Sequence, residues 1–180
     1  MIRKKHRPKT QSAESGVRRF LLLFLGLVAA YYLITLIPWV DRNILYPVLE
    51  FSARSSSLLI NLAGERTTTN GIRIQGPTFA VAVRRGCDPL EPIVLLGSAI
   101  IAFPASWKRR VLGIAVGGSL LFLINILRIT SLYWLGKGKS HLFETVHLEL
   151  WPALFILLSL ILWVLWLLWV RHNDTAAEHA

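Results

Sequence analysis

Several apolar stretches of this 180-residue chain are long enough to cross a lipid bilayer, and they constrain its fold more than any other feature. A helix needs about 20 consecutive apolar residues to span the roughly 30 Å hydrocarbon core. Four predicted crossings meet or approach that length: residues 20–39, 90–105, 111–135 and 151–170. Because 54% of the residues are hydrophobic and gather in these blocks, the sequence predicts an all-α integral membrane protein.

The distribution of charge predicts the orientation of these crossings. The formal net charge is +10, but the basic residues cluster at the ends of the apolar blocks and form no binding face, so we expect no nucleic-acid partner. With four crossings, the segments on the same side of the membrane as the amino terminus hold eleven Lys/Arg against three acids. The segments on the opposite side hold eight Lys/Arg against seven acids. Because cytoplasmic loops carry the excess of Lys/Arg, both termini are predicted to be cytoplasmic.

The same pattern divides the chain into three parts. Residues 1–19 are predicted to be a disordered basic cytoplasmic tail, residues 20–170 a single membrane-embedded domain, and residues 171–180 a second cytoplasmic tail. A cleaved signal peptide is the alternative for the first block. Its apolar part is too long for a typical signal and lacks a small-x-small cleavage site, which favours a retained helix.

Two segments between the first and second crossings have a different character. Residues 43–64 carry Glu50, Arg54, Ser57 and Asn61 on one helical face. Because a charged stripe is costly in mid-bilayer, we expect an amphipathic helix at the interface or packed across the bundle. Residues 67–83 alternate, contain a Gly-Pro turn and are rich in β-branched residues, which predicts a small extracytoplasmic β-hairpin.

That hairpin leads to Cys87, the only cysteine of the chain. A single cysteine excludes an internal disulfide and a two-cysteine redox relay. We expect Asp88 to be the N-cap of the second crossing, with Pro89 and Glu91 in its first turn. A thiol beside a helix N-terminus has a lowered pKa, which predicts a reactive thiolate. No metal-ligand cluster or cofactor-binding motif is present, so no metal or cofactor is predicted.

The predicted topology brings Cys87 to the same leaflet as two other polar groups. Arg128 lies roughly 10 Å below the outer end of the third crossing, and His147 lies in a polar loop, residues 136–150, before the fourth. Asn125, three residues before Arg128, shares its face and is expected to orient the guanidinium. An arginine in an apolar helix indicates a functional site. The alternatives are an inert packing cysteine, an arginine that snorkels to the headgroups, and ordinary loop histidines, His141 included.

Three short motifs resemble the exosortase/archaeosortase family of multi-pass membrane cysteine transpeptidases. They are an extended run into the cysteine, an Asn-x-x-Arg helix and a histidine before the last helix: Val81-Ala82-Val83-Arg84-Arg85-Gly86-Cys87, Asn125-Ile126-Leu127-Arg128 and Phe143-Glu144-Thr145-Val146-His147. The resemblance covers roughly residues 65–170 and is greatest to the exosortase H subgroup. It implies Cys87, Arg128 and His147 as catalytic residues. We expect Asn125 and Asp88 to position them. Asp88-Pro89 replaces the Ser-Gly that follows the cysteine in many members.

The resemblance implies a protease-transpeptidase at the periplasmic face of a bacterial inner membrane. Its substrates would be exported proteins that end in a short motif, a transmembrane helix and a basic cluster. Cys87 would form a thioester, and the acceptor would be water or an amine of a glycan or lipid. His147 would act as acid and base, or only as a cation. Two other classes stay open: a non-enzymatic scaffold, and a small transporter subunit that uses Arg128.

Overall fold

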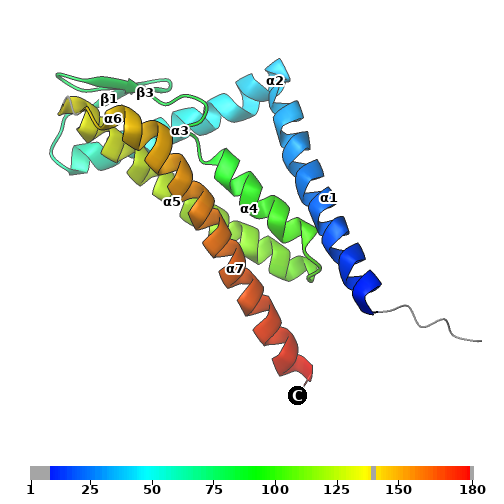
Figure 1. Ribbon diagram of the computed structural model, residues 1–180. Coiled ribbons are helices and arrows are strands. Elements are labelled where there is room, and N and C mark those ends of the chain that lie inside the picture. Colours follow the sequence, from blue (N-terminus) through cyan, green and yellow to red (C-terminus); the bar gives the residue numbers. More distant parts are fainter. Residues whose placement is uncertain (1–8, 139–140, 179–180) are drawn as a thin grey trace, which may run out of the picture.

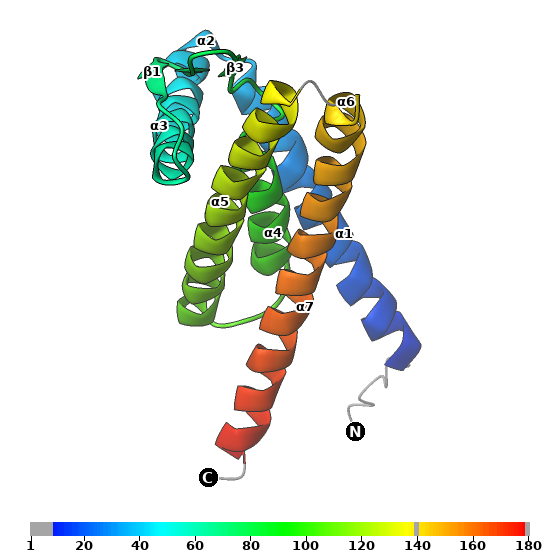
Figure 2. The ribbon, with the colours of Figure 1, turned by 90° about the vertical axis from the view of Figure 1, so that its left-hand side faces the viewer.

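The computed structural model describes residues 9–138 and 141–178, which form a bundle of long helices capped at one end by shorter elements (Figure 1). The long helices are α1 (Lys9–Thr35), α4 (Leu90–Ala102), α5 (Trp107–Lys137) and α7 (Trp151–Glu178). Both α1 and α5 run toward the capped end, whereas α4 and α7 run away from it (Figures 1 and 2). The alternating direction agrees with the predicted order of crossings.

Three helical segments of the described chain are long and apolar enough to cross a membrane: Glu14–Thr35, Trp107–Lys137 and Phe143–Asn173. The predicted second crossing, residues 90–105, is shorter than expected, because α4 has only 13 residues. At a rise of 1.5 Å per residue it measures about 20 Å, less than the hydrocarbon core. It ends because Phe103 adopts an extended conformation before Pro104.

The predicted tails are largely helical. Helix α1 begins at Lys9, so the prediction of a disordered segment 1–19 is wrong from that residue on, and residues 1–8 lie outside the described chain. Helix α7 continues to Glu178 and so includes most of the predicted tail, residues 171–180. Residues 179–180 lie outside the described chain. Neither extension contains a proline, so a helix that starts in the apolar block propagates through it.

A continuous helical segment lies across the capped end of the bundle. It comprises α2 (Pro38–Val40), the π-helical turn η1 (Asp41–Leu45) and α3 (Tyr46–Leu62), and α3 packs against α5 (Figure 1). A helix over residues 43–64 was expected either at the interface or packed across the bundle, and α3 occupies most of this range and packs against α5. On its polar face, Ser57 Oγ lies 2.7 Å from Thr67 Oγ1, and Asn61 Oδ1 accepts a hydrogen bond from the Thr67 N–H at 2.7 Å. The polar stripe therefore anchors the segment that follows it.

The extended segment is a three-stranded antiparallel sheet, where a single hairpin was predicted. Its strands are β1 (Thr68–Asn70), β2 (Arg73–Gln75) and β3 (Ala80–Ala82), in that spatial order. Gly71, at φ +57°, makes the additional turn between β1 and β2, a conformation that glycine adopts without strain. The central Ile74 is fully buried in a cluster with Ile60 and Tyr133, which fixes the sheet on α3 and α5.

The turn after β2 approaches α5 closely, and this contact predicts the effect of a small substitution. A Cβ atom at Gly76 would lie 1.9 Å from the hydroxyl of the buried Tyr133. We expect Gly76→Ala to destabilise the protein by about 1–3 kcal/mol, because Tyr133 or the turn must shift. Gly97→Ala is the matched control, since a Cβ there meets no atom within 4 Å. Thermal unfolding in detergent measures both, and equal melting temperatures would contradict the contact.

Candidate active site

The loop between β3 and α4 holds Cys87 in a tight turn. The Cys87 N–H donates to the Arg84 carbonyl at 2.9 Å, and Gly86 has φ +82°. Asp88 closes the loop with its carboxylate: Oδ2 accepts from the Gly86 N–H at 3.2 Å, and Oδ1 accepts from the Leu90 N–H at 2.9 Å. The loop is thus fixed by its own backbone and by one buried carboxylate.

The start of α4 differs from the prediction. The helix begins at Leu90 and Pro89 occupies the cap position, so the predicted N-cap at Asp88 is one residue too early. Asp88 still accepts a hydrogen bond from the first helical N–H. Because Cys87 lies three residues before the helix, the helix N-terminus is less able to stabilise a thiolate there than predicted.

The thiol contacts the two residues that the sequence places with it. Cys87 Sγ lies 3.5 Å from His147 Nδ1 and 3.6 Å from Nε2, and Arg128 Nη2 donates to Sγ at 3.7 Å. Cys87 lies in the loop between β3 and α4, His147 lies in the segment before α7, and Arg128 lies in α5. The structure therefore brings the three predicted catalytic side chains into one cluster at the capped end of the bundle.

Arg128 is buried within this cluster. It is only 3% exposed, which rules out the alternative that it snorkels to the lipid headgroups. Its guanidinium carbon lies 5.6 Å from the centroid of the Phe155 ring on α7, a cation–π contact. Its Nε has no hydrogen-bond partner in the described part of the chain. The Nε–H is therefore a buried donor that no atom of the described residues satisfies.

His147 lies in a helix, although the sequence predicted a polar loop over residues 136–150. Helix α6 (Phe143–Thr145) and the π-helical turn η2 (Val146–Leu150) lead directly into α7. The His147 ring stacks on Phe143, with centroids 5.8 Å apart and planes 23° from parallel. Such π-helical turns are frequent at functional sites, since the extra residue turns side chains out of the regular helical register. His141 is exposed on the preceding turn.

Asn125 does not play the predicted role. It is fully buried on α5, but neither its Oδ1 nor its Nδ2 has a hydrogen-bond partner among the described residues. The expected hydrogen bond to the Arg128 guanidinium is therefore absent from this structure. The spacing of three residues places both on one side of α5, but this does not bring the amide into a hydrogen bond with the guanidinium.

Burial determines the ionisation of the thiol. Cys87 is 9% exposed, and loss of solvent raises its pKa above the ordinary value. Arg128 opposes this shift and Asp88 adds to it. The predicted lowering of the Cys87 pKa is thus wrong for this state, because the nearby cation does not offset the burial.

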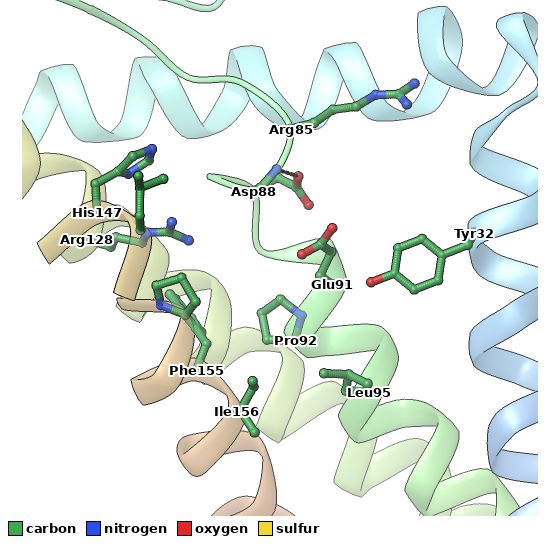
Figure 3. Close-up of a pocket in the computed structure, with 13 residues that line it drawn as sticks. Tyr32, Arg85, Asp88, Glu91, Pro92, Leu95, Arg128, His147, Phe155 and Ile156 are labelled. Atoms are coloured by element: carbon green, nitrogen blue, oxygen red, sulfur yellow. Dashed lines mark hydrogen bonds between the residues drawn. The ribbon is translucent and has the colours of Figure 1, made fainter. Parts of the chain in front are cut away.

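A pocket of about 390 Å³ lies beside the cluster (Figure 3). Its walls include Gly86 and Asp88, which flank the cysteine, and both partners of the thiol. Tyr32, Arg85 and Glu91 also line it, and the sequence did not single them out. Arg85 was detectable only by its position near Cys87. It donates to Asp41 from Nε at 3.2 Å and to the Thr35 carbonyl at 3.3 Å, which ties the cysteine loop to the end of α1.

The sequence matches a family model described as transmembrane exosortase over residues 13–164. This match extends over most of the chain and includes all three residues of the cluster. It confirms the family indicated by the sequence motifs. The comparisons with curated proteins and with solved structures give no significant match.

The raised pKa predicts how Cys87 reacts with an alkylating reagent. Because the charged thiolate is disfavoured, we expect the rate of iodoacetamide alkylation to rise with a midpoint above about 8.5, the value for a free cysteine. Arg128→Gln should move the midpoint further upward, since it removes the opposing positive charge. Arg84→Gln is the control, because Arg84 is an exposed cation next to the same loop. A wild-type midpoint below the free value would contradict the burial of the thiol.

Proposed function

This chain belongs to the transmembrane exosortase family, and we propose that it is a cysteine protease-transpeptidase that cleaves carboxy-terminal sorting signals of exported proteins. The observation that supports this most strongly is the contact of the single thiol with an imidazole and a buried guanidinium. A nucleophile within reach of a base, beside a fixed cation, is the arrangement that acyl transfer requires.

In the proposed reaction, Cys87 Sγ attacks the carbonyl carbon of the scissile peptide while its proton passes to His147. The C–N bond of the resulting tetrahedral intermediate then breaks, and the imidazolium donates the proton to the leaving amine. The substrate remains bound as a thioester. Water or an acceptor amine attacks that thioester and its proton passes to His147; the C–S bond then breaks, and the imidazolium returns the proton to the sulfur.

Arg128 is suited to stabilise the oxyanion of this reaction. Its side chain keeps its charge at all physiological pH values, so it does not act as a proton donor. Its Nη2 contacts the thiol, so a carbonyl attacked by that sulfur comes within reach of the same guanidinium. A donor fixed in a desolvated site stabilises such charge without reorganisation.

Two observations weigh against the non-enzymatic alternatives. A scaffold needs no imidazole in contact with a thiol, and a transporter that uses Arg128 as an anion site needs no nucleophile beside it. The experiment is co-expression with a tagged exported protein that ends in a short motif, an apolar helix and a basic cluster. We expect wild type to shorten it and to form a hydroxylamine-sensitive adduct. Cys87→Ser should do neither; shortening by Cys87→Ser would refute the proposal.

We propose a bacterial inner membrane as the location, with the site facing the periplasm. Spheroplasts and inverted vesicles treated with a small membrane-impermeant thiosulfonate test this orientation. Because Cys87 is the only cysteine, every adduct reports its position. We expect modification in spheroplasts alone. Modification only in inverted vesicles would reverse the topology.

The shape of the guanidinium predicts the outcome of a conservative substitution. Arg128→Lys keeps the charge but loses the planar fork, so it cannot contact the thiol and the oxyanion together. We expect cleavage to fall about 100- to 1,000-fold, as for the loss of one oxyanion donor. Immunoblotting should show an unchanged amount of membrane-inserted protein. Cleavage near the wild-type rate would show that charge alone suffices.

The two histidines before α7 provide a matched pair. His147 contacts the thiol, whereas His141 is exposed, so His147→Ala should lose about 100- to 10,000-fold in cleavage and His141→Ala should retain it. His147→Arg separates the two remaining roles, since arginine supplies charge but transfers no proton. We expect His147→Arg to be inactive. Retained activity would assign His147 a cationic role only.

A further inference from the structure

A second, apolar cavity adjoins the pocket beside the thiol. This cavity has a volume of about 170 Å³, and the two share Leu95 of α4 and Ile156 of α7 as lining residues. Figure 3 shows these two side chains at the lower edge of the pocket beside the thiol. We name the two adjoining cavities together the α1–α4–α7 groove, after the helices that line both of them.

The floor of the groove consists of two helical stripes. On α4 the lining residues are Leu95, Leu96 and Ala99, and on α7 they are Ile156, Ser159, Leu160 and Trp163. Spacings of three and four residues place each set on one helical face. Ser159 Oγ donates to the Pro92 carbonyl at 3.2 Å, which ties α7 to α4 and satisfies the hydroxyl. Two such parallel stripes form a trough of the kind into which a third helix packs.

Helix α1 forms the far wall of the groove. It contributes Phe24, and the Phe20 and Trp163 rings meet with centroids 5.8 Å apart at the end away from the thiol. In the ribbon, α4 lies between α1 and α7 (Figure 1). Leu160 is 53% exposed, so the groove is open beside this residue. In a bilayer this opening faces lipid.

We propose that the α1–α4–α7 groove binds the transmembrane helix of the substrate, the segment that follows the scissile bond; this rests on the proposed function. Its polarity matches that segment. Arg128, His147 and Asp88 line the pocket beside the thiol, and the second cavity is lined almost entirely by apolar side chains. An occupant that passes from a polar peptide to an apolar helix matches both parts, with its polar end beside Arg128 and His147, which contact the thiol.

The groove also sets the distance between the cut and the substrate helix. From Glu91, beside the cluster, to Leu95, where the apolar cavity begins, α4 rises about 6 Å. Only a few extended residues separate a helix seated in the groove from the thiol. We expect that inserting six flexible residues before the substrate helix moves the cut by the same number of residues toward that helix. A cut that stays with its motif would show that the groove does not position the helix.

Site-specific crosslinking tests the binding directly. A photoreactive phenylalanine replaces Leu160 in the groove or, as control, Leu123 on α5, whose exposure of 57% is similar. Both enzymes carry Cys87→Ser, so the tagged substrate stays intact. We expect an adduct with the substrate from position 160 at least ten times as abundant as from position 123. Equal adducts, or an adduct of position 160 with phospholipid only, would overturn the proposal.

A filling substitution provides a second readout. Ala99→Trp places a large ring on the groove floor, and Leu123→Trp adds the same ring on the lipid-facing side of α5. We expect Ala99→Trp to reduce substrate cleavage more than tenfold, with the alkylation rate of Cys87 unchanged, and Leu123→Trp to change neither. Full cleavage by a correctly inserted Ala99→Trp would overturn the proposal. Failure of the wild type to cleave would instead refute the proposed function.

Discussion

The contact between the buried Arg128 guanidinium and the Cys87 thiol determines how the elements around the site must meet. A cation removed from water is costly unless its environment compensates for it. Here the compensation comes from three directions: the thiol on its loop, the ring of Phe155 on α7 and the polar wall of the pocket. Helix α5 supplies the arginine itself, so the loop, α5 and α7 all converge on one charge.

The cysteine loop keeps the thiol in place without a helix N-terminus at its side. Asp88 closes the loop from within, and Arg85 ties it to the end of α1 through Asp41 and the Thr35 carbonyl. The same enclosure raises the pKa of Cys87, so the resting thiol is protonated near neutral pH. In the proposed mechanism, the proton leaves only when a carbonyl is present and His147 accepts it, which protects the thiol from adventitious reaction.

Access to this site fits a substrate that arrives within the membrane. The pocket adjoins an apolar cavity, and α1, which forms the far wall of the groove, contacts α7 through Phe20 and Trp163. The short α4 forms part of its floor. A helix too short to span the bilayer alone is stabilised because α1, α5 and α7 pack around it. The shortness of α4 is therefore compatible with its place in the bundle.

The sequence by itself determined the membrane class and a helix over most of residues 43–64, and it predicted the cluster of Cys87, Arg128 and His147 from apolar length, charge distribution and short motifs. Local patterns did not determine the helical continuation through His147, the lack of a hydrogen bond between Asn125 and the guanidinium or the raised pKa of the thiol. These depend on packing between segments distant in the chain. Burial is a property of the assembled bundle, and only the tertiary structure decided how far each polar side chain is removed from solvent.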